Sequence, residues 1–297
     1  MVGRPEQIRV YDAVFAEYFA GPRPERASDG VQVTVSGAVT EDVEVGLASE
    51  LELLREKSFA QCSEEELDAL AALMARSPVV PPLRRTRRVE PARRGAPDLR
   101  RTLRRSLRTG GDPVERAWRR RRVRPRRLVL LVDVSASMAE YTRALLLYAH
   151  AAVRADRRCE VFCFGTRLTR LTPALLSAEP DEALERAAAL ALDRDAGTRI
   201  GEALKSFLDE YGHRGLARGA LVVICSDGLE VGDPALLRDQ AERLGRLAWR
   251  VVWLNPLKGD PAYEPLTRGM RAALPHVDVL ASGHNLASLE GLAMLIE

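Results

Sequence analysis

The chain has 297 residues, of which 46% are hydrophobic and 5% aromatic, and this composition suits a helix-rich α/β domain with a smaller additional segment. No apolar run approaches the roughly 18 to 20 residues needed to cross a bilayer, and the first residues lack a basic and then apolar leader. We therefore expect a cytoplasmic protein without a membrane span. The four cysteines form no CxxC pair, which predicts reduced and mostly buried thiols rather than a metal or redox site.

The net charge of +3 hides three segments of different charge. Residues 1–83 carry 7 Lys or Arg against 15 Asp or Glu, whereas residues 84–127 carry 19 Arg against 4 acidic residues. The remainder of the chain is mildly acidic. We expect an acidic helical region over residues 1–83, an Arg-rich linker and helical segment over 84–126, and one domain over 127–297.

Helical signals occur twice in the acidic region. Apolar residues between positions 11 and 19 recur at the spacing of an amphipathic helix, and Ser63 with Glu66 forms a capping box ahead of a second apolar stripe. Residues 21–42 lie between these signals, are rich in Gly, Pro and Ser, and predict a loop.

A further helix is predicted inside the Arg-rich segment, because Leu99, Leu103 and Leu107 repeat every four residues. Clustered arginines could neutralise the phosphates of a nucleic acid. However, Trp118 is the only aromatic residue of the segment, which disfavours a base-stacking surface. We therefore expect the arginines to dock on an acidic protein surface, in this chain or in a partner, and keep nucleic-acid binding as the alternative.

Apolar strands alternate with helices from residue 127 onward. Strands are expected over 127–135, 159–165, 219–228, 249–256 and 277–282, and helices over 141–155, 181–192, 199–212 and 234–248. The strands are continuously rather than alternately apolar, which indicates a mostly parallel sheet covered by helices on both faces. The predicted fold is thus a doubly wound, Rossmann-like α/β domain, in which ligands bind beyond the carboxyl ends of the strands.

Side chains with oxygen donors follow two of these strands. Asp133, Ser135 and Ser137 lie in one tight loop after the first strand, Asp227 comes at the end of the third, and Thr198 precedes a helix. Oxygen donors without His or thiolate favour Mg²⁺, with Mn²⁺ as the second choice, over Zn²⁺. We expect these five residues to be metal ligands, and two carboxylates leave room for a carboxylate from another molecule.

Two other interpretations of these residues stay open. The Ser-rich loop could merely cap the following helix, and Asp227 could merely form a turn with Gly228. A two-carboxylate Mg²⁺ site could also activate water for phosphoester hydrolysis. Because the chain has no HExxH, GxSxG or GxxxxGK[ST] motif, we expect no catalytic residues and no enzymatic activity of the chain alone.

The pattern DxSxS…T…D resembles the metal-ion-dependent adhesion site (MIDAS) of von Willebrand factor A (vWA) domains. The likeness covers residues 127–297 and includes the stretches "VFCFGTRLTRLTPAL", "GTRIGEAL", "SDGLEVGDP" and "GMRAALPHVDVL". These stretches, and "TLRRSLRTGGDPVERAWRRRRVRPRR" before them, are similar to the CoxE-like branch of the family. Two positions depart from its pattern: Ala136 stands where glycine is usual, and "DRDAGT" stands where Trp-Ser-Gly-Gly-Thr is more frequent.

The resemblance implies a non-catalytic, Mg²⁺-dependent adaptor. The CoxE-like branch is associated with MoxR-type AAA+ ATPases and with the maturation of carbon monoxide dehydrogenase. It therefore implies a MoxR-type ATPase as partner, and as client a metalloenzyme such as carbon monoxide dehydrogenase or another molybdenum hydroxylase. The oxygen ligands are intact, so we expect metal binding to survive the two departures while loop shape and partner preference change.

Overall fold

The computed structural model describes residues 50–76, 81–107, 116–191, 197–212 and 215–295. The described residues all belong to one compact unit, Ser49–Glu297. The helix expected near residues 11–19 and the loop expected at 21–42 lie outside the described residues.

A six-stranded sheet forms the centre of this unit, with the strand order β6-β5-β4-β7-β8-β9. Its strands are β4 (Leu128–Asp133), β5 (Glu160–Phe164), β6 (Leu168–Arg170), β7 (Leu221–Cys225), β8 (Arg250–Asn255) and β9 (Val279–Ser282). All neighbours pair in parallel except β5 and β6. The predicted mostly parallel sheet is confirmed, and β6 is a short antiparallel edge strand that the sequence pattern did not indicate.

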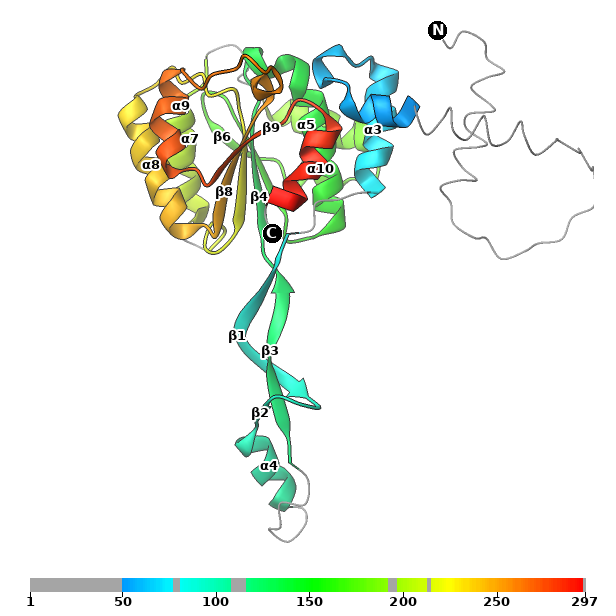
Figure 1. Ribbon diagram of the computed structural model, residues 1–297, viewed down its shortest axis with the longest axis vertical. Helices are drawn as coiled ribbons and strands as arrows, with labels where there is room; N and C mark the ends of the chain where they lie inside the picture. Colours follow the sequence, from blue (N-terminus) through cyan, green and yellow to red (C-terminus); the bar gives the residue numbers. More distant parts are fainter. Residues whose placement is uncertain (1–49, 77–80, 108–115, 192–196, 213–214, 296–297) are drawn as a thin grey trace, which may run out of the picture. The chain divides into compact units, whose positions relative to one another are not determined.

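Helices cover both faces of this sheet (Figure 1). The core on one face includes side chains of α3 (Glu64–Arg76), α5 (Ala139–Ala155), α6 (Pro180–Leu190) and α10 (Leu286–Leu295), and the core on the other includes α7 (Ile200–Phe207), α8 (Pro234–Leu247) and α9 (Arg268–Ala273). Leu128 and Leu130 of β4 face the first core, and Val129 and Leu131 face the second, which is why the strand is apolar throughout. No helix in the described part of the chain has the length and apolar character needed to cross a bilayer.

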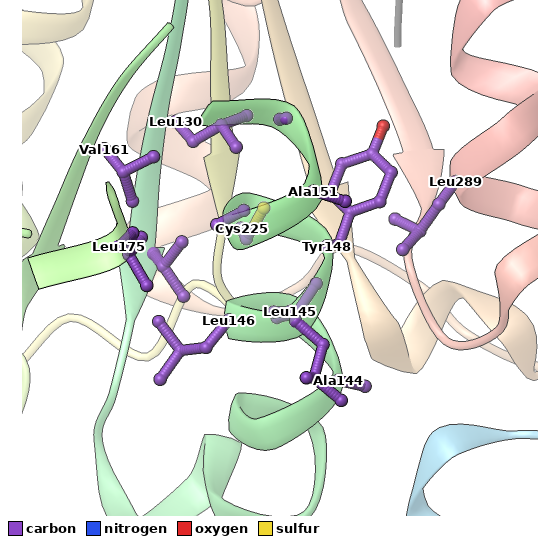
Figure 2. Packing of buried hydrophobic residues seen from close by; sticks show 14 of the residues in the cluster. Leu130, Ala144, Leu145, Leu146, Tyr148, Ala151, Val161, Leu175, Cys225 and Leu289 are labelled. Carbon is purple, nitrogen blue, oxygen red and sulfur yellow. The ribbon is translucent and has the colours of Figure 1, made fainter. Parts of the chain in front are cut away.

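The helix α5 fills the centre of the first core (Figure 2). Tyr148 extends from α5 toward Leu289 of α10, while Leu175 and Val161 lie on the opposite side of the helix. Cys225 of β7 lies behind the same helix. All four cysteines are free, and three of them are buried as predicted.

Residues 50–76 pack into this domain instead of forming a separate acidic region. The predicted capping box begins α3: the Ser63 N–H donates to the Glu66 carboxylate (2.8 Å), and the Glu66 N–H donates to Ser63 Oγ (3.2 Å). Phe59 is buried, and its N–H donates to the carbonyl of His284 (2.8 Å). The boundary at residue 83 was predicted from charge alone. Charge does not show that apolar side chains of α3 belong to the core of the domain.

The Arg-rich segment folds as an antiparallel ribbon with a short helix. β1 (Leu83–Ala92) pairs with β3 (Trp118–Pro125), β2 (Ala96–Pro97) adds two residues, and α4 (Leu99–Ser106) is the helix predicted from the leucine spacing. The strands stand where a linker was expected, because exposed Arg-rich strands lack the apolar alternation of half-buried ones. We call residues 83–107 and 116–125 the arm.

Arginine contacts fix the base of the arm to the domain. The Arg126 guanidinium lies 4.2 Å from the ring centre of Trp249 and donates to the Gly219 carbonyl (3.2 Å). Arg158 donates to the carbonyl of Pro125, the last residue of β3 (2.9 Å). The side chains of residues 119–123 in β3 are exposed, so the base is anchored while the rest of this strand faces solvent.

Gly201 lets α7 approach α8 closely. A Cβ atom at this position would lie 2.8 Å from the backbone nitrogen of Leu237. We expect Gly201→Ala to force the two helices apart and to lower the free energy of unfolding by about 1 to 3 kcal/mol, measured by chemical denaturation. Gly291→Ala is the control, because nothing lies within 4 Å of a Cβ added there in α10, and alanine favours the helix. Equal stability of the two variants would contradict this packing.

Candidate metal site

The strand order reverses between β4 and β7. From β4 the chain passes through α5 to β5 on one side, and it later returns to β7 on the other side of β4. Ligands of doubly wound sheets bind at such a switch point, beyond the carboxyl ends of the strands. Asp133 is the last residue of β4 and Asp227 lies two residues beyond β7, so both predicted carboxylates fall at the switch point.

The loop after β4 brings together the three ligands predicted from its DxSxS pattern. The Ser135 N–H donates to Asp133 Oδ1 (3.0 Å), and the hydroxyl oxygens of Ser135 and Ser137 lie 3.2 Å apart. Asp133 and Ser135 are buried, with 0% and 5% of their surface exposed, whereas Ser137 is exposed. Ser137 is therefore the predicted ligand nearest to solvent on this loop.

The Ala136 departure from the usual glycine leaves this loop unstrained. No described residue other than glycine has a positive φ, so Ala136 adopts a backbone conformation open to any residue. Residues 192–196, which hold most of the second departure, lie outside the described residues, and Gly197 at its end has a φ of +82°. The loop of Asp133 is thus compatible with alanine.

Ser226 is a site residue that sequence reasoning missed. Its hydroxyl donates to Asp133 Oδ2 (2.7 Å) and accepts the Gly228 N–H (3.0 Å), and its carbonyl accepts from the Trp253 indole (2.8 Å). Ser226 therefore links the end of β7 to the end of β4. A serine directly before Asp227 was the available signal, but only the pairing of the two strands shows which carboxylate it contacts.

Burial raises the pKa of Asp133 to about 6, and the negative charge of Asp227 acts in the same direction. Hydrogen bonds from Ser135 and Ser226 oppose this shift by stabilising the ionised form. A carboxylate in this position is ionised at neutral pH only at a cost in free energy, and a cation beside it would remove that cost. The burial of Asp133 therefore fits a bound metal ion.

A second loop carries Asp227 and connects it to Thr198. The Leu229 N–H donates to Asp227 Oδ1 (3.0 Å), and the Val231 N–H donates to the Thr198 carbonyl (2.9 Å). The residue after Thr198 donates its N–H to the carbonyl of Gly165, directly beyond β5 (3.0 Å). These bonds place Thr198, which is 3% exposed, between the loop of Asp227 and the end of β5.

Glu230 is a second residue that sequence reasoning missed. Glu230 is 7% exposed, and its carboxylate accepts the N–H of Gly201 (2.8 Å) at the start of α7 and the N–H of Gly232 (2.6 Å). Burial raises the pKa of Glu230, and the backbone donors oppose the shift. A carboxylate at a helix N-terminus also interacts favourably with the helix dipole. Glu230 thus joins the loop of Asp227 to the helix that follows Thr198.

The predicted ligands supply two carboxylates and three hydroxyls, from Asp133, Asp227, Ser135, Ser137 and Thr198. Within the described ranges, no group of three or more His, Cys, Asp or Glu side chains is arranged to hold a metal. The candidate site therefore depends on hydroxyl donors, and this set suits Mg²⁺ or Mn²⁺ better than Zn²⁺. An octahedral ion with these ligands keeps room for water or for a ligand from another molecule.

Two of the three described histidines form hydrogen bonds away from the predicted ligands. His150 Nε2 lies 3.0 Å from the Ser177 carbonyl, and His284 Nδ1 lies 2.6 Å from Ser282 Oγ. His276 belongs to the short 3-10 helix after α9, and residue 213 is outside the described part of the chain. None of these three described imidazoles hydrogen-bonds a predicted ligand.

A doubly wound sheet with DxSxS, Thr and Asp at its switch point defines the vWA class of domain. One family model of this class, described as "VWA domain containing CoxE-like protein", matches residues 68–289. The chain belongs to this CoxE-like family, which confirms the resemblance seen in its motifs. The match includes the arm and most of α3 as well as the sheet. A search of the curated proteins found no match to the chain.

Three solved structures are examples of proteins to which the chain is similar. BatB from Bacteroides thetaiotaomicron is 17% identical, with a TM-score of 0.39 over 57% of this chain and 96% of that one. A von Willebrand factor type A protein from Catenulispora acidiphila is 16% identical, with a TM-score of 0.40 over 59% and 42%. Proximal thread matrix protein 1 of the mussel byssus is 12% identical, with a TM-score of 0.40 over 58% of this chain and 47% of that one. Another structure of the mussel protein has a zinc-occupied MIDAS motif.

The raised pKa of Asp133 predicts how the stability of the metal-free protein depends on pH. The carboxyl ionises near pH 6 in the folded state instead of near 3.8, so its ionisation destabilises the fold increasingly between these values and fully above pH 6. A shift of this size corresponds to about 3 kcal/mol. In EDTA we expect Asp133→Asn to be more stable than the parent at pH 7.5 by up to this amount, with a difference that shrinks toward pH 4.

Urea denaturation across this pH range measures the effect. Asp239→Asn is the control, because Asp239 is exposed on α8 and its charge is already in water. A stability difference for Asp133→Asn that does not change with pH would show that burial does not penalise the charged carboxylate.

Proposed function

We propose that the chain is a non-catalytic, Mg²⁺-dependent interaction protein that recruits a carboxylate from a partner protein. The observation that carries the proposal is the convergence of Asp133 and Asp227 with hydroxyl donors at the switch point, with Asp133 fully buried. Mg²⁺, or Mn²⁺ in its place, would be held by Asp133, Ser135, Ser137, Thr198 and Asp227. When bound, the ion supplies an electrophilic point that accepts a further oxygen ligand.

The side chains of this site have separate tasks. Ser226 and the Ser135 N–H orient the two oxygens of Asp133, and Ser137 borders the solvent from which a partner approaches. Two carboxylates balance the charge of a divalent ion without filling its coordination sphere. An Asp or Glu presented by another protein is the natural additional ligand.

The placement of other polar groups supports an interaction role over phosphoester hydrolysis. Hydrolysis at a metal site needs a base or a second metal near the attacking water. The Glu230 carboxylate on the same loop is occupied by the backbone N–H groups of Gly201 and Gly232. The imidazoles of His150 and His284 hydrogen-bond to Ser177 and Ser282, and His276 lies in the 3-10 helix after α9.

Membership of the CoxE-like family suggests the partner and the client. We propose a MoxR-type AAA+ ATPase as the partner, and the maturation or metal-centre assembly of a larger enzyme as the joint task. Carbon monoxide dehydrogenase or another molybdenum hydroxylase is the client class that the family resemblance favours. This work would take place in the cytoplasm.

Removal of single ligands tests the ion site. Asp133→Ala and Asp227→Ala should each weaken Mg²⁺ binding at least about tenfold, and Ser135→Ala or Thr198→Ala less, because a neutral donor attracts a cation less than a carboxylate does. Calorimetric titration with Mg²⁺, Mn²⁺ and Zn²⁺ measures these affinities. Glu202→Ala is the control, because Glu202 is an exposed acid in the first turn of α7. Unchanged affinity in a folded Asp133→Ala variant would place the ion elsewhere.

The same variants test the function. A MoxR-type ATPase from the same genome should bind the chain in Mg²⁺ and fail to bind in EDTA or with Asp133→Ala. Association that persists in EDTA would separate the ion from partner capture. Mg²⁺-dependent phosphoester hydrolysis by the purified chain, lost in Asp133→Ala, would overturn the non-catalytic assignment.

For the arm, we propose docking on an acidic protein surface. Successive side chains of a strand point to opposite faces, and residues 119–122 of β3 are four consecutive exposed arginines, so both faces of the ribbon are basic. Arg120 already pairs with Glu90 of β1 (2.9 Å), which shows the kind of carboxylate contact the arm can make. Trp118, the aromatic residue of β3, is half-buried, which disfavours base stacking.

Charge reversal tests this docking role. We expect the ATPase to bind severalfold more weakly, and in a salt-dependent way, to the variant Arg119→Glu, Arg120→Glu, Arg121→Glu, Arg122→Glu. The Mg²⁺ affinity of this variant should stay unchanged. The control variant is Arg186→Glu, Arg238→Glu, Arg246→Glu, which reverses the charge of three arginines exposed on α6 and α8. A gel-shift series that shows nucleic-acid affinity falling steeply with salt, with a smaller slope after the arm substitutions, would favour the nucleic-acid alternative instead.

A further inference from the structure

Exposed apolar side chains gather around the loop of Asp227. Seven large apolar side chains are exposed in the described part of residues 127–297, and three of these are scattered over the surface at Leu176, Leu190 and Met294. The other four follow β7 or β8 or precede α9. We call these four the apolar collar: Leu229 (45% exposed), Val231 (62%), Leu257 (45%) and Leu266 (57%).

Two collar residues are bonded directly to predicted ligands of the ion. The Leu229 N–H donates to Asp227 Oδ1 (3.0 Å), and the Val231 N–H donates to the Thr198 carbonyl (2.9 Å). These bonds hold the backbone of both collar residues next to predicted ligands, and the Val231 side chain lies beside Gly197, the residue before Thr198.

The other two collar residues join the same loop from neighbouring segments. The Leu257 N–H donates to Asn255 Oδ1 (2.9 Å), and Asn255 Nδ2 donates to the Asp227 carbonyl (3.0 Å). Leu266 directly precedes a threonine whose hydroxyl donates to the Gly228 carbonyl (3.0 Å). The collar is thus assembled around one loop by three separate stretches of the chain.

The backbone of this loop is held in place, so the collar cannot readily turn inward. Gly228 has a φ of +80°, and a Cβ atom there would overlap Met270 of α9. Glu230, between two collar residues, is fixed by backbone donors on two segments. Apolar surface left in water is unfavourable relative to the same surface buried. A group of apolar side chains held exposed beside a polar site is typical of a contact surface.

A positive charge completes the chemistry of this surface. The exposed Arg268 donates to the carbonyls of Glu230 (3.2 Å) and Gly232 (3.1 Å) and so lies against the collar loop. A nucleic acid or a purely acidic protein surface would leave the collar in water. A peptide that carries a carboxylate between apolar side chains would satisfy the ion, Arg268 and the collar together.

We propose that the apolar collar and the ion site form one recognition surface for a peptide segment in which an Asp or Glu is flanked by apolar residues such as Leu, Val or Phe. This inference rests on the ion site of the proposed function and names the partner chemistry that this site accepts. The carboxylate adds a ligand to the ion, and the flanking side chains bury the collar. Binding of the peptide then depends on the ion through its carboxylate, and gains further affinity from the contact of its apolar side chains with the adjacent collar.

Selection from a phage-displayed library of random 12-residue peptides tests the partner chemistry. The full chain, immobilised in Mg²⁺, should enrich peptides with an acidic residue between apolar ones, and EDTA should release them. Enrichment of peptides without an acid, of acidic peptides without apolar neighbours, or of no Mg²⁺-dependent peptide would each overturn the proposal.

Collar variants test the surface itself with a selected peptide and fluorescence polarisation. The double variant Leu229→Ser, Val231→Ser should bind the peptide at least about tenfold more weakly than the parent, while its Mg²⁺ affinity stays within about twofold. Leu176→Ser with Leu190→Ser is the matched control, because both leucines are exposed on other elements, and it should bind like the parent.

Two failures are distinguishable in these samples. If the parent binds no Mg²⁺ by calorimetry, the ion site of the proposed function is wrong. If the parent binds Mg²⁺ and the collar variant binds the peptide as tightly as the parent does, the ion site stands and the collar inference is wrong.

Discussion

The parallel pairing of β4 with β7 is the constraint on which the candidate site depends. The register places Val132 opposite Cys225, so the next residues, Asp133 and Ser226, come side by side although 93 positions separate them in sequence. Their hydrogen bond of 2.7 Å joins the two strand ends at the switch point. The DxSxS loop begins from one strand end and the loop of Asp227 begins from the other. The two groups of predicted ligands therefore approach each other because these strands are neighbours.

Burial has two effects on the candidate site: it holds the polar side chains in one orientation, and it disfavours the negative charge of Asp133. Asp133 and Asn255 are fully buried, and each has hydrogen-bond partners that hold it in one orientation. Buried polar groups with satisfied hydrogen bonds specify one arrangement of a core. The same burial disfavours the negative charge of Asp133, and a metal ion would balance that charge. The burial of Asp133 thus lowers the stability of the metal-free fold and, in the proposed site, would favour binding of the ion.

The arm and the collar are surfaces of different physical character. The arm presents arginines on both faces of an exposed ribbon, and attraction between exposed charges is long-ranged and weakened by salt. The collar presents apolar side chains beside a site for a cation, and contacts of that kind act at short range and are less sensitive to salt. Electrostatic steering by the arm and selection at the collar would therefore govern different steps of one encounter.

The sequence by itself determined the features that depend on residues a few positions apart. The five parallel strands of the sheet, the helices α5 to α8, the capping box of Ser63 and Glu66 and the DxSxS loop were predictable, because periodicity and spacing carry them. Only the tertiary structure decided that Ser226 contacts Asp133 and that the Glu230 carboxylate accepts a backbone N–H at the start of α7. It also decided that the arm is built mainly from paired strands. These features depend on backbone donors and strand neighbours from distant segments. Contacts of this kind leave no local pattern in the sequence. A serine or glutamate by itself does not show which distant residue it will contact once the strands have paired.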